Sequence, residues 1–294
     1  STSFGGIIPT ESAKHHEKVK EEVYQEALKI AGISENEIDA LAFSCGPGLA
    51  PCLLVGLRFV KELAEKLKIP VVPVNHCLSH LEIGKITGAR DPVLLYCSGA
   101  NTQIIAYAAG KYRIFGETLD IGIGNFIDTF ARYAGIGFPG GKKIEELALK
   151  GKYVELPYSI KGMDVAFSGM LTKLRNLLES KKYRLEDLSF SLQETAFAML
   201  VEASERAMAH TGKKELLLGG GVACNKRLQE MCEIMCKERK ASFFCPENSL
   251  LVDNGAMIAY LGEIMFRAGI IEHVDKLDIK PRERTDEVDV RWKN

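Results

Sequence analysis

Two histidines stand four residues apart in the segment Asn75-His-Cys-Leu-Ser-His80, and this spacing could support metal chemistry. On an α-helix, residues i and i+4 lie on one face one turn apart, so both imidazoles can reach the same cation. A third, anionic ligand would complete such a site. The segment is not an HExxH motif, because it has no glutamate to act as a metalloprotease base. The alternative is that His76 and His80 are two unrelated residues on a polar helix face.

Two loops of small residues could bind an anion. Ser98-Gly-Ala-Asn101 follows a predicted buried strand, and Gly219-Gly-Gly-Val-Ala-Cys-Asn225 follows another and leads into a helix. Small side chains let backbone N–H groups approach phosphate oxygens, and α/β sheets bind nucleotides at the carboxyl ends of their strands. Neither loop is a GxGxxG motif. The alternatives are an ordinary tight turn for the first loop and a helix-packing turn for the second.

Glycines and carboxylates are mixed between residues 116 and 145, in a pattern that favours a ligand-lining surface over a core. The segments concerned are Gly116-Glu-Thr-Leu-Asp-Ile-Gly-Ile-Gly-Asn125, Asp128, Phe138-Pro-Gly-Gly141 and Glu145. Further along, Asp253-Asn-Gly255 opens a predicted helix, where an aspartate is ordinarily an N-cap. Residues 142–184 contain ten Lys or Arg and five Asp or Glu. This local positive charge suits either a solvated face or a surface that contacts nucleic acid phosphates.

The elements that must position these residues alternate between strands and helices, which is typical of an α/β fold. We expect strands at 40–44, 70–75, 92–97, 102–108, 111–115, 215–218 and 242–245. We expect helices at 11–31, 56–68, 124–134, 170–182 and 186–211, a further helix that ends near 239, and one from 253 to about 267.

The composition is that of a globular protein with a sizeable core. Of 294 residues, 46% are hydrophobic and 26% charged, which excludes disordered and collagen-like classes. No apolar run approaches the ~20 residues that cross a bilayer, and no signal-peptide pattern is present, so we expect a cytoplasmic protein without membrane contact. Eight cysteines in apolar or helical stretches predict reduced thiols. The net charge of −1 means that nucleic acid binding must depend on a local patch or a partner.

The order of these motifs resembles a known family. Besides the histidine segment, the motifs are Leu95-Tyr-Cys-Ser-Gly-Ala-Asn-Thr-Gln103, Gly116-Glu-Thr-Leu-Asp120, Phe138-Pro-Gly-Gly141, Gly162-Met-Asp164, Phe167-Ser-Gly169, Gln193-Glu-Thr-Ala-Phe197, Gly220-Gly-Val-Ala223 and Asp253-Asn-Gly-Ala-Met-Ile-Ala259. From Gly5 to about Trp292 the chain resembles the tRNA N6-adenosine threonylcarbamoyltransferase family, formerly described as O-sialoglycoprotein endopeptidase-like. The resemblance is to the catalytic subunit of the archaeal and eukaryotic KEOPS complex.

The resemblance implies the actin-like ATPase (ASKHA) fold, an α/β architecture of two lobes with nucleotide and metal between them. We expect an N-terminal lobe at 1–91, with 269–294 packing back on it, and a C-terminal lobe at 92–268 that carries the nucleotide and phosphate loops. Members of the family normally open with a strand pair and a phosphate-facing loop that precede the first residue here. We therefore expect the first strands of the N-terminal lobe to be missing.

The resemblance also implies a set of ligand-binding residues, although it assigns no catalytic residue. The metal, iron or zinc, would be held by His76, His80 and Asp253, with Tyr96 close to it. The nucleotide would be bound by Tyr96, Ser98, Gly99, Asn101, Asp128, Gly141, Glu145 and Asn225. Within this set, Ser98, Gly99 and Asn101 would meet phosphate, whereas Asp128, Gly141, Glu145 and Asn225 would hold the ribose and adenine.

The implied reaction is acyl transfer. Threonylcarbamoyl-AMP would donate its threonylcarbamoyl group to N6 of the adenosine 3′ of the anticodon in tRNAs that read ANN codons, and AMP would be released. A bound cation can polarise the carbamoyl oxygen. ATP and AMP are further implied ligands.

Implied partners are tRNA and three KEOPS subunits: the small kinase subunit, the dimerising small subunit and the kinase-binding subunit. The implied location is the cytoplasm, and the nucleus as well in a eukaryote. One alternative function is an ASKHA-type ATPase or small-molecule kinase, although such enzymes use Mg²⁺ and two imidazoles suit zinc or iron better. The other is a non-catalytic scaffold within KEOPS.

Overall fold

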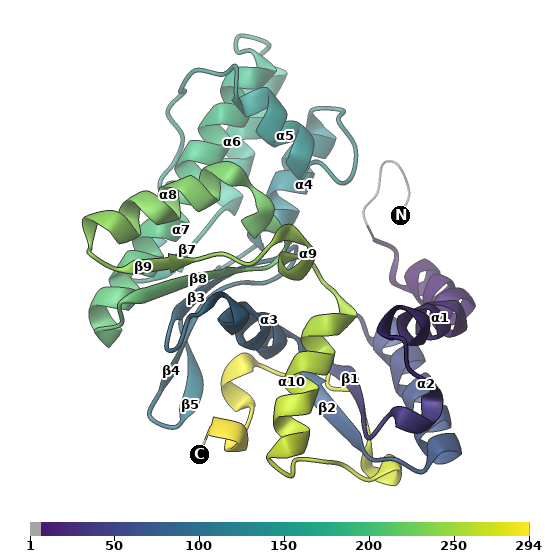
Figure 1. Ribbon diagram of the computed structural model, residues 1–294. Coiled ribbons are helices and arrows are strands. Elements are labelled where there is room, and N and C mark those ends of the chain that lie inside the picture. The colour runs from purple at the N-terminus through teal and green to yellow at the C-terminus, as the bar shows by residue number, and fades with distance from the viewer. Residues whose placement is uncertain (1–6, 294) are drawn as a thin grey trace. The chain divides into compact units, whose positions relative to one another are not determined.

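The computed structural model describes residues 7–293, which form two compact units (Figure 1). Within these residues, unit 1 comprises Ile7–Ile83 and 254–293, and unit 2 comprises Gly84–Asp253. These boundaries differ from the expected ones at 91/92 and 268/269. The second boundary differs because helix α10 (Gly255–Arg267) packs on the strands of unit 1.

Unit 1 is built on two parallel strands, β1 (Leu41–Gly46) and β2 (Val71–Asn75), which are joined by α2 (Ala50–Leu67). The helix α1 (Pro9–Ala31) packs against α2, and α10 lies along both strands (Figure 1). Gly262 of α10 allows this close approach, because a Cβ atom there would lie 2.4 Å from the Cβ of Ala42. The buried hydrophobic residues of this core are Phe43, Cys45, Leu57, Val60, Ala64, Val71 and Leu277.

Two details of unit 1 differ from the sequence predictions. Helix α2 begins at Ala50 instead of residue 56, because Pro51 lies in the first turn, where no intrahelical N–H donor is needed. The second concerns α1, where apolar residues at helical spacing are exposed, with Val23 at 61% and Ile30 at 79%. Among the residues that contact α2 is Tyr24, whose ring meets that of Phe59 edge to face.

Unit 2 contains a five-stranded mixed sheet in the order β5-β4-β3-β8-β9. The strands are β3 (Val93–Cys97), β4 (Thr102–Ala108), β5 (Lys111–Glu117), β8 (Glu215–Gly219) and β9 (Ser242–Phe244). Strands β3, β8 and β9 are parallel, so their carboxyl ends meet at one edge of the sheet. Strand β4 is antiparallel to both of its neighbours, β3 and β5.

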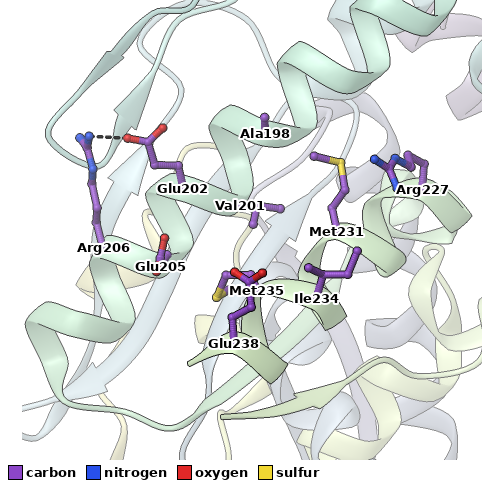
Figure 2. Close-up of a pocket in the computed structure, with 10 residues that line it drawn as sticks. All are labelled: Ala198, Val201, Glu202, Glu205, Arg206, Arg227, Met231, Ile234, Met235 and Glu238. Carbon is purple, nitrogen blue, oxygen red and sulfur yellow. Dashed lines mark hydrogen bonds and ion pairs between the residues drawn. The ribbon is translucent and has the colours of Figure 1, made fainter. Parts of the chain in front are cut away.

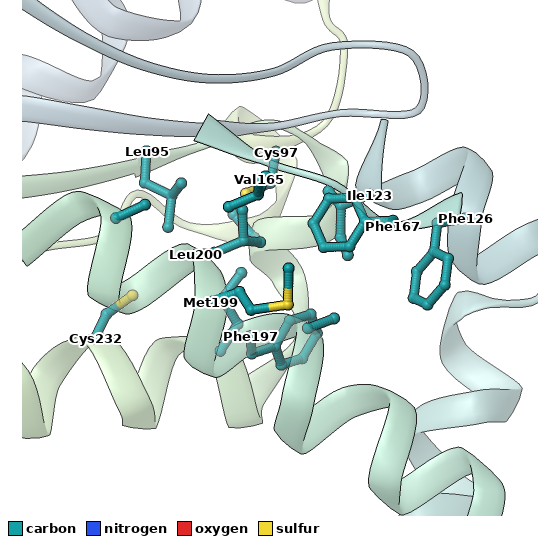
Figure 3. Close-up of a cluster of buried hydrophobic side chains, with 14 of the residues drawn as sticks. Leu95, Cys97, Ile123, Phe126, Val165, Phe167, Phe197, Met199, Leu200 and Cys232 are labelled. Atoms are coloured by element: carbon teal, nitrogen blue, oxygen red, sulfur yellow. The ribbon is translucent and has the colours of Figure 1, made fainter. Parts of the chain in front are cut away.

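Helices cover this sheet and form the largest core of the chain. They are α4 (Ile123–Tyr133), α5 (Gly141–Ala148), α6 (Ser168–Glu179), α7 (Leu185–Thr211), α8 (Lys226–Glu238) and the short α9 (Asn248–Leu251). Figure 3 shows Leu95 and Cys97 of β3 facing Met199 and Leu200 of α7. Because α7 is buried along most of its length, it is the central helix of unit 2.

The predicted elements of unit 2 are present, but the helices α5 and α9 and the two-residue strands β6 (Ile160–Lys161) and β7 (Asp164–Val165) were not predicted. Helix α5 begins at Gly141, the last residue of Phe138-Pro-Gly-Gly141, a segment whose composition indicates a loop. The remaining helical elements of the described chain are α3 (His76–Gly84) and six short 3₁₀ helices. The 3₁₀ helices are Glu35–Glu37, Lys85–Thr87, Gly221–Cys224, Val274–Lys276, Thr285–Glu287 and Arg291–Lys293.

Two further predictions concern the whole described chain. All eight cysteines are free thiols, as the sequence indicates. Across residues 7–293, none of the helices combines the length and the hydropathy that crossing a membrane requires.

Candidate functional site

The helix that carries the histidine pair is fixed at its start by Asn75. This residue is the last of β2, and its Oδ1 accepts a hydrogen bond of 3.1 Å from the N–H of Leu78. Asparagine is a favoured N-cap because its short side chain satisfies a backbone donor of the first turn. Helix α3 therefore starts at His76 directly after the strand, and the first histidine occupies the first helical position.

His76 and His80 lie close together, as the i, i+4 spacing predicts. Their ring centroids are 5.1 Å apart and the rings are nearly perpendicular, at 78°. His76 is half-buried, whereas His80 is only 1% exposed. One nitrogen of each ring lies within 4.8 Å of the other and of a carboxylate oxygen of Asp253.

Asp253 is the residue immediately before the second segment of unit 1. The sequence allowed it to be the N-cap of the following helix, but that cap is Asn254, whose Oδ1 accepts a 2.8 Å hydrogen bond from the N–H of Met257. The side chain of Asp253 is exposed. The donor set of two imidazoles and one carboxylate suits zinc or a non-haem iron and leaves a coordination position for a further ligand.

The predicted phosphate loop, Ser98–Asn101, is a tight turn between β3 and β4. The N–H of Ser98 donates to the carbonyl of Asn101 over 2.8 Å, and the Ser98 hydroxyl oxygen accepts from the N–H of Asn101 over 3.0 Å. Within the described chain, the N–H groups of Gly99 and Ala100 form no hydrogen bond. Two adjacent backbone donors at the end of a strand can bind an anion.

Several glycines are explained by packing against this turn. A Cβ atom at Gly122 would lie 2.4 Å from the carbonyl oxygen of Gly99, and one at Gly124 would lie 2.7 Å from the Cα of Gly99. Gly220 has φ of +88°, and its Cβ would lie 2.3 Å from the carbonyl oxygen of Cys97. The start of α4 therefore rests on the turn itself, and Gly220 packs on the backbone at the end of β3.

The four residues expected at the ribose and adenine lie around the starts of α5 and α8. Asp128 Oδ1 accepts a 2.8 Å hydrogen bond from the N–H of Gly140, the residue before Gly141. Glu145 Oε1 accepts a 2.8 Å hydrogen bond from the N–H of Lys226. Next to Lys226, Asn225 is the N-cap of α8.

The side chains of Asp128, Glu145 and Asn225 already have structural roles. The side chain of Asn225 caps α8 through Oδ1 and donates from Nδ2 to Gln193 over 2.9 Å. Burial raises the pKa of Asp128, although the hydrogen bond from Gly140 and the charge of Arg132 lower it in part. A nucleoside would therefore compete with existing bonds at Asn225 and Glu145.

Asp120 is a residue whose role the sequence did not reveal. Burial by itself would raise its pKa, but hydrogen bonds from the Ser168 hydroxyl and from the N–H groups of Phe167, Ser168 and Ile121 hold the pKa below its usual value. Asp120 thus joins the end of β5 to the start of α6. The family motif contains this aspartate, but local spacing gave no sign of a partner so far along the chain.

Tyr96 is the one predicted ligand residue that lies inside a strand. It is 1% exposed in the middle of β3, opposite Gln103 on one side and Gly219 on the other. Its role at the metal stays a prediction.

A recess between α7 and α8 in unit 2 is separate from all the predicted site residues (Figure 2). It has a volume of about 630 Å³ and is lined by Ala198, Val201, Glu202, Glu205, Arg206, Arg227, Met231, Ile234, Met235 and Glu238. Its two arginines are already neutralised, because Arg206 pairs with Glu202 and Arg227 pairs with Glu194 at 2.7 Å. The recess therefore offers no unpaired cation for a nucleotide phosphate.

The mixed sheet and the helices that cover it are those of an actin-like α/β protein. Two crystal structures of HypF have a similar fold at low sequence identity. Full-length HypF in its phosphate- and nucleotide-bound form aligns with a TM-score of 0.64 at 11% identity, over 83% of this chain and 49% of that one. HypF of T. kodakarensis aligns with a TM-score of 0.62 at 14% identity, over 85% and 43%. These similarities confirm the predicted two-lobe fold class and carry no information about function.

Sequence comparison identifies the family. The family model described as tRNA N6-adenosine threonylcarbamoyltransferase (TsaD) matches residues 1–260. The protein of that name from Thermococcus kodakarensis is 55% identical over 99% of this chain and 90% of its own length, and that from Methanococcoides burtonii is 53% identical over 98% and 87%. A probable bifunctional tRNA threonylcarbamoyladenosine biosynthesis protein from Thermoplasma volcanium is 53% identical over 98% of this chain and 55% of its own length. The chain belongs to the tRNA N6-adenosine threonylcarbamoyltransferase family, and it is a transferase that modifies tRNA.

Proposed function

We propose that the chain transfers the threonylcarbamoyl group of threonylcarbamoyl-AMP to N6 of the adenosine 3′ of the anticodon in tRNAs that read ANN codons, with release of AMP. The observation that carries the site assignment is the cluster of His76, His80 and Asp253, whose ligand atoms lie within 4.8 Å of one another. This donor set favours the transferase over the ATPase or kinase alternative, because Mg²⁺ prefers oxygen ligands.

His76, His80 and Asp253 would hold one iron or zinc ion, with Tyr96 close to it. When bound, such an ion supplies a Lewis acid that stabilises negative charge on the carbamoyl oxygen and on the departing phosphate. The two histidines lie on consecutive turns of one capped helix, so their relative positions are largely fixed before the ion binds.

The turn at Ser98, Gly99 and Asn101 would bind the phosphate of the adenylate. Support comes from the two N–H groups of Gly99 and Ala100 that are not used inside the turn. Ser98 and Asn101 bond to each other and hold the turn closed, so these donors are oriented in advance.

Asp128, Gly141, Glu145 and Asn225 would hold the ribose and adenine. Asp128, Glu145 and Asn225 each accept a backbone hydrogen bond at the start of α5 or α8. Gly141 has no heavy atom within 4 Å of the place where a Cβ would be, so a ligand has room beside it.

We further propose that tRNA contacts the basic segment 142–184. All ten of its Lys and Arg residues are exposed. Of these, Lys143, Arg175 and Arg184 form ion pairs with residues that the structure describes. The other seven leave a positive charge that can displace counterions from a phosphate backbone.

The proposed partners are the small kinase subunit, the dimerising small subunit and the kinase-binding subunit of a KEOPS complex in the cytoplasm. The bifunctional names of relatives such as the Thermoplasma volcanium protein support an association with a second protein of the same biosynthesis. Co-purification of the chain with separately produced subunits tests this assignment, and failure of every subunit to associate would contradict it.

The experiment that tests the metal site compares two double variants. Changing His76 and His80 to alanine should remove the iron or zinc measured by elemental analysis and lower transfer of labelled threonylcarbamoyl to tRNA by at least about 100-fold. Changing His15 and His16, an exposed pair on α1, is the matched control and should alter neither quantity. Full metal content in the first variant would disprove the ligand assignment.

A further inference from the structure

The helix that carries the two metal-ligand histidines is held at both ends by the last part of the chain. At its start, Nδ2 of Asn75 donates a 3.0 Å hydrogen bond to Oε2 of Glu283. Near its end, Nε1 of Trp292 donates to Oε1 of Glu82 over 3.4 Å, and Glu82 is only 3% exposed. All four residues belong to unit 1. None of these contacts involves a proposed metal ligand, but together they restrain both ends of the helix that carries the two histidines.

Glu283 is itself held firmly in place. Its other carboxylate oxygen, Oε1, accepts a 2.9 Å hydrogen bond from Nζ of Lys280, and its side chain is 11% exposed. This hydrogen bond raises the pKa of Lys280, so the ammonium stays charged beside the carboxylate. Both carboxylate oxygens of Glu283 therefore have a partner, and the buried negative charge is compensated.

The segment that carries Glu283 is anchored to β1 by the backbone. The N–H of Lys280 donates to the carbonyl of Cys45 over 2.6 Å, and the N–H of Gly48 donates to the carbonyl of Pro281 over 3.2 Å. The approach is so close that a Cβ atom at Gly46 would lie 1.9 Å from the carbonyl oxygen of Lys280. The carboxylate of Glu283 is thus fixed relative to the two strands of unit 1.

The amide of Asn75 connects this anchor to the metal ligands. Its oxygen caps α3 at the N–H of Leu78, and its nitrogen is bound by Glu283. Because both the oxygen and the nitrogen of the amide are bound, the side chain of Asn75 is held in one orientation. The next residue in the chain is His76. A small rotation of Asn75 would turn the first helical residue and change the direction of its imidazole.

We propose that Glu283 is a positioning residue for the metal ligands: through Asn75 it sets the orientation of α3, so that His76 and His80 present their nitrogens to one cation. This inference rests on the proposed metal site. Residues that orient metal ligands without touching the metal commonly change its affinity by about 10- to 100-fold when they are removed. Trp292 and Glu82 restrain the other end of the same helix.

The test uses Co²⁺ alone as a spectroscopic probe of the metal-free full chain. Glu283→Ala should weaken Co²⁺ binding by about 10-fold or more and change the visible absorption band that reports ligand geometry. Glu283→Gln keeps an oxygen that accepts from Asn75 but loses the charge that pairs with Lys280, so it should restore the affinity and the spectrum without restoring the melting temperature. Asp289→Ala, at an exposed acid in the same segment, is the matched control.

The outcomes separate the inference from the proposed function. If Glu283→Ala binds Co²⁺ as tightly as the control and with the same spectrum, while the double histidine variant does not bind it, Glu283 has no positioning role and the metal site stands. If the double histidine variant still binds Co²⁺ with wild-type affinity, the metal site and this inference both fail.

A second variant covers the case in which Glu283→Ala does not fold. Asn75→Asp keeps the oxygen that caps Leu78 but cannot donate to Glu283, and it places two carboxylates side by side. It should weaken Co²⁺ binding to the same degree. Wild-type affinity in folded Asn75→Asp would overturn the inference.

Discussion

Replacing Gly220 with alanine should distort the turn Ser98–Asn101, the proposed phosphate site, without changing any proposed ligand residue. Gly220 follows β8, and its φ of +88° is unfavourable for every residue except glycine. The added Cβ would lie 2.3 Å from the carbonyl oxygen of Cys97, the residue just before Ser98. The matched control is Gly221→Ala in the same loop, where the new Cβ meets no heavy atom within 4 Å.

The expected cost has two parts. A non-glycine residue with positive φ costs roughly 1–2 kcal/mol. Relief of the overlap with a backbone carbonyl requires the loop after β8 to move by about 1 Å, and overpacking of this kind costs roughly 1–3 kcal/mol. Together these give about 3 kcal/mol, which in a unit of this size lowers the Tm by roughly 6–12 °C.

The functional effect should exceed the effect on stability. A displacement of about 1 Å at a positioned binding group can reduce a rate by about 100-fold. We therefore expect Gly220→Ala to weaken AMP binding, measured by calorimetry well below its Tm, by at least about 10-fold. Gly221→Ala should match the wild type in both Tm and AMP affinity.

Two results would refute this reasoning. Equal AMP affinity in the two variants, with only Gly220→Ala destabilised, would mean that the triple glycine serves packing alone and that phosphate binds elsewhere. Equal Tm values would mean that the close contact with Cys97 is relieved without cost.

Three further predictions concern the same unit. Glu145→Ala should weaken AMP binding more than Glu179→Ala, an exposed acid paired with Arg175, and equal affinities by calorimetry would make Glu145 purely structural. The folded-state pKa of Asp120 lies below its unfolded value, so the contribution of this carboxylate to stability is complete above a pH of about 4. That contribution is lost as the pH falls through the folded-state pKa. The Tm difference between wild type and Asp120→Asn should therefore shrink below a pH of about 4. Binding of tRNA to the isolated chain should be weak and should fall steeply with salt because the charge available is that of 142–184, and tight, salt-insensitive binding would contradict the proposed surface.

Local periodicity predicted most of the elements, whereas their packing had to come from the structure. Buried strands such as Val93–Cys97 and the long helix α7 follow directly from apolar runs and spacing. Helix α5 was missed because its first residue is a glycine. The exposed apolar residues of α1 show that periodicity does not reveal which face of a helix is covered.

The candidate site shows the same limit. The spacing of His76 and His80 predicted their proximity, but the choice of Asp253 as third ligand needed the family resemblance, because no local pattern connects residues so far apart in sequence. Asn75 could have been recognised as an N-cap from its type and place before a helix. The role of Glu283 could not have been recognised from the sequence, since its hydrogen bond to Asn75 depends on how the last segment of the chain packs on β1.

Unit 1 is discontinuous, and the three proposed metal ligands lie close to its two breaks in sequence. His76 and His80 stand near the end of its first segment, and Asp253 immediately precedes its second. An unfolded chain cannot bring all three to one ion, so an ion bound by them stabilises the folded state by about 2.7 kcal/mol when its free concentration is a hundred times Kd. Limited proteolysis of the metal-loaded and chelator-treated chain should therefore differ first near residues 84 and 253. The ion would therefore restrain the chain at the two points in sequence where it leaves and re-enters unit 1.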